Sequence, residues 1–477
     1  MRRCHVIVFL LLFAPWAAQP ALAQLEQQAH TYDVTLEDCL AWTLTRNPDI
    51  QQLRADVERA AGSKLVFQSR ALPQLAAQVS FGERGGDLYN SSSIKSITTN
   101  ASSRLVTNMT SALDPKVFGI VTAQFSQPLI DVGIPPTLRR SKLEVVIAQQ
   151  SLNHTVTAIL HDARVTFLRA LYLRDLIALY EGIVQRLRAN VDGEQQRLDV
   201  GTGNKAALAN AKIQELNLEL ALANLRNDYF STVTRLAELC GRDPGERTNG
   251  VWQSRLPKPV GALQYERVSV DWSRESAYAL GHRADLKLFQ ALADAMGADK
   301  QTVQAGYFPL VSLIASGLLI PQNLLVSKQT SIVPGQDPRT SDVRAGVEMT
   351  WLVIDNGQVT GPSHRLEAVQ QEFEITRRKL EQNIPRELAV IEGALESADA
   401  RHDALLKSAE AAEENLRLIE AQVALGAATQ LDFLKAQTDL LSVRVGIADA
   451  TQSYEVAQAE LDRATGRYLE YRAADTQ

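Results

Sequence analysis

Two histidine–aspartate pairs are the residues whose types and spacing could support chemistry. His161-Asp162 and His402-Asp403 each place an imidazole, a common metal ligand and general base, beside a carboxylate. No second set of ligands stands at metal-binding spacing from either pair, and the chain has no phosphate-binding glycine loop and no serine nucleophile elbow. Both histidines fall within predicted long helices. We therefore interpret them as structural residues and predict no enzyme, no metal site and no cofactor.

The cysteines are the other reactive residues. Cys4 lies in a predicted signal peptide, which leaves Cys39 and Cys240, far apart in the sequence with nothing local to pair them. Two distant cysteines do not make a disulfide scaffold. We expect two small buried apolar residues, with a disulfide bridge as the alternative.

The first residues are typical of a secretory signal peptide, which we place at residues 1–23. Arg2 and Arg3 precede an apolar run, and Ala21 and Ala23 are the small residues that a signal peptidase reads. Removing the two arginines changes the formal net charge from -6 to -8. Because nucleic-acid binding needs clustered basic residues, this acidity argues against a nucleic-acid partner.

The rest of the chain contains two tandem copies of one unit. Residues 200–241 match residues 425–466 without a gap, at an offset of 225, and residues 47–50 match residues 283–286 at an offset of 236. Prolines and the lack of a helical period mark a connector between the copies. We divide the chain into a signal peptide (1–23), an N-terminal extension (24–34), repeat 1 (35–241), a linker (242–272), repeat 2 (273–466) and a C-terminal tail (467–477).

Each copy is predicted to contain two long helices joined by a tight turn. Apolar residues recur at alternating steps of three and four from Val156 to Val191, and again from Ile384 to Val423. A spacing of 3.5 residues held this long indicates a coiled-coil seam. At 1.5 Å per residue, residues 136–200 would form a rod of about 100 Å, which suits spanning a distance more than enclosing a core. Pro385 interrupts the second rod, and we expect a kink there.

Short alternating segments precede the long helices in each copy. Strands are predicted near residues 75–81, 121–126, 310–318 and 343–351, with polar loops at 82–116 and 321–342 that we expect to face solvent. One apolar and one polar face is typical of a transmembrane barrel strand and also of a half-buried soluble strand. Beyond the signal peptide no apolar stretch approaches the roughly 20 residues of a membrane helix.

In the order of these features the chain resembles the TolC-like family of outer membrane efflux channels. The resemblance covers about residues 35–466 and rests on the duplicated unit, the Asn47-Pro48-Asp49-Ile50 start, Pro73 ahead of the first strand, and the two tight turns. It implies a mainly α fold with a transmembrane β part. Three chains would form a 12-stranded β-barrel in the outer membrane and a 12-helix α-barrel in the periplasm.

The function that this resemblance implies is an outer membrane channel of a tripartite efflux or type I secretion system. It would conduct small molecules or proteins outward, as a homotrimer in contact with outer membrane lipid, a periplasmic adaptor protein and an inner-membrane pump. A soluble periplasmic coiled-coil adaptor or scaffold is the alternative, although adaptors usually carry one helical hairpin. A secreted hydrolase with helical decoration is the other, and it lacks a catalytic constellation.

The resemblance also implies where the periplasmic entrance lies. The family carries an aspartate six residues beyond the second turn glycine, which is Asp432 here, and the next ring position is Lys435. A ring of three Asp432 and three Lys435 is nearly neutral, so we expect weak selection by charge. An acidic residue favoured by the helix dipole is the alternative interpretation of Asp432. The family's ionic latch positions hold alanine here: Ala206, Ala207 and Ala428.

Two further groups of residues are candidates for contacts. The turns that an adaptor would grip, and that are otherwise ordinary helix caps, comprise Gly201, Thr202, Gly203, Gly426, Ala427 and Ala428. Three aromatic residues near predicted strand ends are candidates for a membrane-interface girdle, with sheet packing as the alternative: Tyr307, Phe308 and Trp351.

Overall fold

The order of elements is the same in both halves of the chain. The computed structural model describes residues 31–84, 116–243, 245–248, 251–320 and 340–470. The predicted signal peptide and most of the two predicted polar loops lie outside these residues. The elements are β1 (Tyr32–Val34), α1 (Leu36–Arg46), α2 (Pro48–Ser69), β2 (Gln74–Arg84), β3 (Lys116–Ile130), α4 (Ile134–Asp199), α5 (Lys205–Leu239), β4 (Gly245–Thr248), β5 (Val251–Ser254), β6 (Pro257–Pro259), α6 (Trp272–His282), α7 (Ala284–Gln304), η3 (Ala305–Tyr307), β7 (Leu310–Ile320), β8 (Thr340–Thr350), α8 (Thr360–Ala424) and α9 (Gln430–Thr465).

The chain forms two compact units, and each draws on both repeats. Unit 1 contains residues 1–52, 153–283 and 383–477, and unit 2 contains residues 53–152 and 284–382. The helices α4 and α8 contribute to both units. Unit 1 therefore contains the parts of α4 and α8 that lead to the turns, the returning helices α5 and α9 and four short strands, and unit 2 contains the longer strands β2, β3, β7 and β8.

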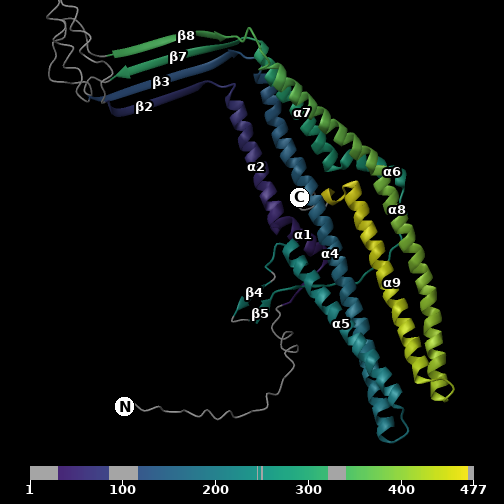
Figure 1. The fold of residues 1–477 in the computed structure, drawn as a ribbon. Helices are drawn as coiled ribbons and strands as arrows, with labels where there is room; N and C mark the ends of the chain where they lie inside the picture. Colours follow the sequence, from purple (N-terminus) through teal and green to yellow (C-terminus); the bar gives the residue numbers. More distant parts are fainter. Residues whose placement is uncertain (1–30, 85–115, 244, 249–250, 321–339, 471–477) are drawn as a thin grey trace, which may run out of the picture. The chain divides into compact units, whose positions relative to one another are not determined.

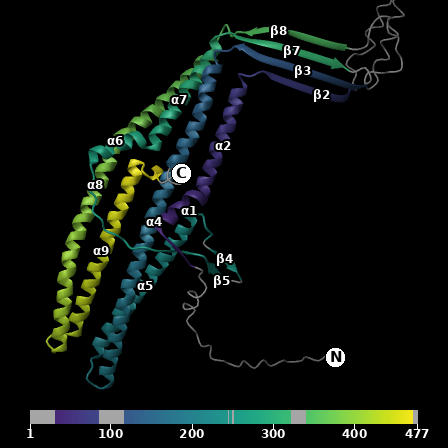
Figure 2. The same cartoon turned by 180° about the vertical axis from the view of Figure 1, so that it is seen from behind.

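In unit 1 the long helices form two hairpins, α4 with α5 and α8 with α9 (Figures 1 and 2). The predicted seam is buried where it begins, as Val156, Ala163 and Leu173 on α4 and Ile384 and Leu388 on α8 show. Nearer the tip of the second hairpin the seam becomes half-buried, from Leu405 to Val423. Burial of the α8 seam, which excludes water from one stripe of the helix, therefore stabilises the second hairpin most at its base, whereas the seam of α4 is buried as far as Val191.

The end of each returning helix packs against the first short helix of its own repeat. We call these two places the joints. At joint 1 Gly241 has φ +64°, and a Cβ on it would lie 2.4 Å from the carbonyl oxygen of Arg46 at the end of α1. At joint 2 the equivalent Gly466 has φ +84°, and its nearest neighbours are backbone atoms of Arg283 at 3.6 Å. Both positions need the left-handed conformation, and only Gly241 also lacks room for a side chain.

The predicted extension and linker contain short strands that the sequence analysis did not foresee. β1 pairs in parallel with β6, and β4 pairs with β5. Strands of three or four residues are too short to show an alternating pattern. The linker then lies along the helices of unit 1, where Arg174 donates hydrogen bonds to the carbonyls of Pro259 and Gly261, and Arg267 pairs with Asp399 on α8.

Unit 2 consists of helices and one antiparallel sheet of order β2-β3-β7-β8. The small side chains Ala291, Ala295 and Ala298 are the buried face of α7, and Arg140 on α4 donates to Asp299 on α7 at 3.0 Å. Most strand ends lie slightly beyond their predicted bounds, but β7 begins at Leu310 as predicted and β8 ends at Thr350, one residue before its predicted end. Residues 82–84 and 340–342, expected in the polar loops, instead continue the ladders of β2 and β8.

The register of this sheet places apolar residues on one face. Leu75 lies opposite Phe125, which lies opposite Ala315, and Ala315 lies opposite Ala345. The adjacent rows Val79–Val121–Leu319 and Leu313–Val347 share that face, while Gln78, Thr122 and Arg344 are on the other. The apolar face is open, since Val79 is 55% and Val343 81% exposed. Large apolar side chains on an open face indicate a surface that another apolar phase covers.

Pro385 lies inside α8, which continues to Ala424 without ending there. The predicted kink at this position stays a prediction. None of the helices in the described part of the chain is long and apolar enough to cross a membrane.

The two joints predict different responses to the same substitution. Gly466→Ala forces alanine into the left-handed region, which costs about 1–2 kcal/mol. We expect Gly241→Ala to lower the unfolding temperature further, because its Cβ must also displace the Arg46 carbonyl. Thermal unfolding followed by circular dichroism compares them, and equal losses would show that the close approach at joint 1 contributes nothing.

Candidate functional site

The two histidine–aspartate pairs have structural partners, as the sequence analysis predicts. His161 is buried, and its Nε2 lies 3.2 Å from Glu460 on α9 instead of pairing with Asp162. A hydrogen bond from His161, with Arg463 alongside, lowers the pKa of Glu460 to about 2. Among the residues that the structure describes, no cluster of three or more His, Cys, Asp or Glu is arranged to hold a metal ion.

His402 packs against the linker. Its ring stacks on Tyr265 with centroids 3.7 Å apart, while its Nδ1 lies 3.9 Å from its sequence neighbour Asp403, beyond hydrogen-bond distance. Tyr265 itself donates to Asp399. His402 therefore helps to fix the linker to α8, which is a packing role.

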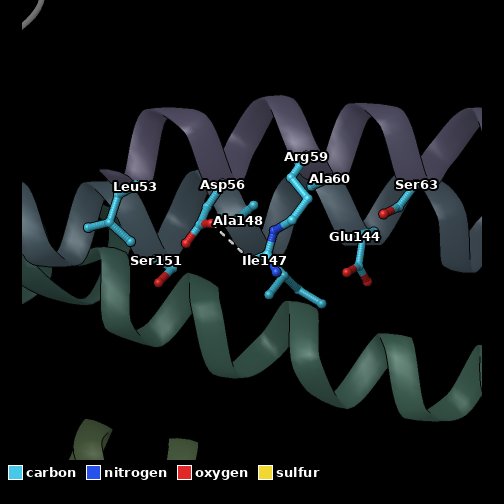
Figure 3. Close-up of a pocket in the computed structure, with 9 residues that line it drawn as sticks. All are labelled: Leu53, Asp56, Arg59, Ala60, Ser63, Glu144, Ile147, Ala148 and Ser151. Atoms are coloured by element: carbon cyan, nitrogen blue, oxygen red, sulfur yellow. Dashed lines mark ion pairs between the residues drawn. The ribbon is translucent and has the colours of Figure 1, made fainter. Parts of the chain in front are cut away.

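A hollow of about 260 Å³ lies between α2 and α4 in unit 2 (Figure 3). The only ion pair among its lining residues in Figure 3 joins Arg59 and Asp56 at 3.0 Å, one turn apart on α2, and the Arg59 side chain is 76% exposed. Its lining is Leu53, Asp56, Arg59, Ala60, Ser63, Glu144, Ile147, Ala148 and Ser151. An exposed ion pair beside serine and alanine provides neither a nucleophile–base pair nor a metal ligand set.

The two predicted turns join the hairpin helices with the same geometry. Gly201 has φ +82° and Gly426 has φ +74°. In the first turn the N–H of Thr202 donates to the carbonyl of Arg197 at 2.9 Å, and in the second Ala427 donates to Gln422 at 2.8 Å. These hydrogen bonds satisfy carbonyls at the end of α4 and of α8, as in a Schellman motif. Both turns are therefore structured helix ends.

Asp432 forms part of the cap of α9. The N–H and hydroxyl of Thr429 donate to its carboxylate at 2.9 and 2.6 Å, and the Thr429 hydroxyl accepts from the Asp432 N–H. This is a capping box. The hydrogen bonds from Thr429, and to a lesser degree the charge of Lys435, lower the pKa of Asp432. Both Asp432 and Lys435 are exposed, so the cap and a role at an entrance are compatible.

A hydrogen bond between the two hairpins is a feature that the sequence analysis missed. Gln430 at the start of α9 donates its amide to the side-chain oxygen of Asn190 on α4 at 2.6 Å. Beside it lies a cavity of about 40 Å³, lined in part by Glu194, Ala211 and Leu434. The two amides are separated by 240 residues. Because ordinary surface amides at that separation have no distinguishing pattern, only the fold reveals the contact.

The predicted girdle aromatics lie at the end of the sheet next to the helices. Trp351 donates its indole N–H to the carbonyl of Tyr307 at 3.0 Å, and the Tyr307 hydroxyl lies 2.9 Å from Thr360. Phe308 and Trp351 are each 54% exposed. The structure brings Tyr307 and Trp351 together, and an aromatic ring with one hydrogen-bonded end and an exposed body suits an interface between water and lipid.

Comparisons with known proteins agree with this architecture. The model of the family described as "Outer membrane efflux protein" matches residues 40–242 and 277–467. The outer membrane efflux protein BepC of Brucella suis is 23% identical over 364 residues, 75% of this chain and 74% of BepC. The outer membrane protein TolC of Escherichia coli is 23% identical over 434 residues, 88% of this chain and 80% of TolC.

Solved structures show the same fold. The outer membrane protein VceC of Vibrio cholerae superposes with a TM-score of 0.68 at 17% identity, covering 90% of this chain and 96% of VceC. The predicted mainly α fold with a β part and a duplicated unit is confirmed. Because the family model matches well over half of the sequence, the chain belongs to the outer membrane efflux protein family.

Proposed function

We propose that this outer membrane efflux channel is entered at the two helix turns of each protomer, around Gly201 and Gly426. Proteins of the family work as homotrimers with a periplasmic adaptor and an inner-membrane pump, and their helical part lies in the periplasm. That family membership favours a channel over a soluble coiled-coil adaptor. The observation that supports the entrance is the hydrogen bond that joins the two hairpins beside these turns. We expect transport without catalysis.

The sheet is the membrane part of this proposal. Among the described residues its edge strands β2 and β8 pair on one side only, and three chains would pair their outer edges into one 12-stranded barrel. The open apolar face of Val79, Val343 and Val347 would contact lipid. The polar face of Gln78, Thr122 and Arg344 would line the lumen.

In this proposal the hydrogen bond between Gln430 and Asn190 holds the two hairpins together near the turns, and we call it the tie. Opening the entrance requires the hairpins to separate, and the half-buried seam of α8 near the tip of the second hairpin resists this only weakly. Ala206, Ala207 and Ala428 occupy the family's ionic latch positions and cannot form an ion pair. In this proposal the neutral amide pair Gln430–Asn190 connects the hairpins instead. At both turns the carbonyls that end the helix are hydrogen-bonded, so the turn backbone is ordered and gives an adaptor a defined surface to bind.

Neighbouring residues of β2 lie on opposite faces of the sheet, so substituting each of them tests which face contacts lipid. Arginine on a lipid-facing barrel position costs about 2–4 kcal/mol near the bilayer midplane. We expect Val79→Arg to reduce the amount of trimer in outer membrane fractions, and Gln78→Arg, one residue away on the other face, to leave it near wild type. The reverse pattern would show that the faces are assigned the wrong way round.

A double-mutant cycle in planar bilayers tests the tie. A neutral hydrogen bond contributes about 1 kcal/mol, which is roughly fivefold for each protomer, and Gln430→Ala and Asn190→Ala each remove it from all three protomers, so each should raise the open probability at least about fivefold. The double variant should open no more than either single variant, because both remove one interaction. Gln422→Ala, an exposed glutamine at the end of α8, is the control and should open like wild type. Additive single effects would exclude a direct tie.

Reversal potentials in a salt gradient test the ring of Asp432 and Lys435. The wild type should select weakly by charge. Lys435→Ala leaves three carboxylates and should make the channel cation-selective, whereas Asp432→Asn leaves three ammonium groups and should make it anion-selective. If neither substitution moves the reversal potential, Asp432 is a helix cap and no more.

The cap makes this selectivity depend on pH in a defined direction. Hydrogen bonds from Thr429 lower the pKa of Asp432, so its negative charge persists to a lower pH than that of an uncapped aspartate. In the Lys435→Ala background, Thr429→Val removes the hydroxyl and should shift the loss of cation selectivity to higher pH. Thr429→Ser retains the hydroxyl and should not. Identical pH profiles would show that the cap does not control the charge of the ring.

A further inference from the structure

The side chains of Cys39 and Cys240 meet in the interior of joint 1. Their sulfurs lie 3.2 Å apart although 201 residues separate them in the sequence. Cys39 is on α1, Cys240 directly follows α5, and both are fully buried. Both are thiols in the structure. Both residues are buried, as expected, and their contact is what the sequence could not reveal.

In joint 2 the positions equivalent to the two cysteines are occupied by other residue types. By the repeat offsets of 236 and 225, Cys39 corresponds to Glu275 and Cys240 to Thr465. Glu275 is buried and accepts from Arg467 at 2.5 Å. An ionic hydrogen bond thus fastens α6 to the segment that follows α9. In joint 1 the position of the acid holds a thiol instead.

The arginine of this arrangement is present in both joints. Arg242 corresponds to Arg467, and its guanidinium lies 4.0 Å from the ring centre of Trp42 and 4.4 Å from that of Tyr32. Arg467 lies 5.5 Å from the ring centre of Tyr278, the counterpart of Trp42. The Nε of Arg242 is buried and has no hydrogen-bond acceptor among the described residues. Joint 1 therefore contains the arginine and its aromatic contact, but it has no carboxylate in the place where Glu275 pairs with Arg467 in joint 2.

We propose that Cys39 and Cys240 are joined by a disulfide bond in the exported protein. A protein of the outer membrane folds in an oxidising compartment, where two thiols in contact become oxidised and remain so. A disulfide needs sulfurs about 2 Å apart, so the pair must approach by roughly 1 Å, which side-chain rotation of two adjacent cysteines can supply. The bond would fasten joint 1 covalently where joint 2 is fastened by charge.

The oxidant is a dithiol–disulfide exchange protein, and the reaction balances as two successive exchanges. The Cys240 thiolate attacks the oxidant's disulfide, which forms a mixed disulfide and releases one thiolate of the oxidant. The Cys39 thiolate then attacks the Cys240 sulfur and releases the second. The chain loses two protons and two electrons, and the oxidant becomes a dithiol.

Burial decides when this reaction takes place. No oxidant reaches two fully buried thiols in the folded chain, so the exchange happens while α1 and α5 are coming together in the periplasm. The bond closes a loop that contains β2, β3 and the first helical hairpin. Cross-linking a segment this long restricts the unfolded chain strongly, and the bond would hold repeat 1 closed as a unit.

Thiol counting on the full-length protein tests the proposal. Cells are quenched with acid, and the outer membrane protein is denatured and treated with a maleimide–polyethylene glycol. We expect wild type to gain no polymer without reductant and two polymers after reduction. The Cys39→Ala variant retains one thiol and should gain one polymer with or without reductant, which calibrates the shift. Two polymers on unreduced wild type, or a disulfide-linked dimer of chains, would overturn the proposal.

A second measurement shows whether the bond fastens the joint. Wild-type trimer that is reduced in denaturant and refolded under reductant should unfold at a lower temperature than the oxidised trimer, and the same treatment should leave the unfolding temperature of Cys39→Ala/Cys240→Ala unchanged. An equal response of both proteins to this treatment would refute a stabilising bond. The number of polymers that wild type gains shows whether the bond exists, even if the variants do not fold.

Discussion

The two joints are the constraint on which the rest of the chain depends. A helical hairpin of this length buries one narrow and repetitive seam, so contacts outside the seam are needed to fix where each hairpin begins. At each joint a glycine in the left-handed conformation ends the returning helix, and the chain turns back against the short helix that began the repeat. Asn47 and Arg283, equivalent residues, each donate to a carbonyl at the end of that returning helix. These contacts fix where both hairpins begin.

Joint 2 is also the centre of a network of charges. Glu387 on α8 accepts from both Arg283 and Arg463, and Arg463 pairs in turn with Glu460, which His161 contacts from α4. Such buried and half-buried pairs are weak evidence for stability, because desolvation offsets much of their attraction. Their geometry is directional, however, and it orients α4, α8 and α9 relative to one another. The histidine that first suggested chemistry is one of the residues that set this orientation.

The second hairpin is held unequally along its length, and this suits the proposed entrance at the turns. Near the joints the seam side chains are buried and the polar contacts are numerous. Toward the turns the seam of α8 is half-buried, and one amide hydrogen bond crosses between the hairpins beside a small cavity. Segments with few buried contacts open at low cost in free energy, whereas the joints do not. A rigid base and a weakly held α8 tip permit the tip of the second hairpin to move without unfolding the rest.

The sequence by itself determined the elements whose signals are local or periodic. The seams, the alternating strands, the turn glycines and the duplicated unit all follow from patterns that span many residues, so chance cannot reproduce them. The three- and four-residue strands β1, β4, β5 and β6 have no such pattern, and their pairing is set by neighbours distant in the chain. The capping box at Asp432 could have been predicted from the sequence, because Thr429 stands three residues before it.

Only the tertiary structure decided which residues meet across long separations. Asn190 and Gln430, and Cys39 and Cys240, are ordinary residue types separated by 240 and 201 positions. Nothing in a single sequence distinguishes such a pair from any other, because their contact results from the packing of whole helices. The repeat offsets made Cys39 equivalent to Glu275, but only the fold showed that Glu275 is fastened to Arg467 and thereby what a pair of cysteines replaces.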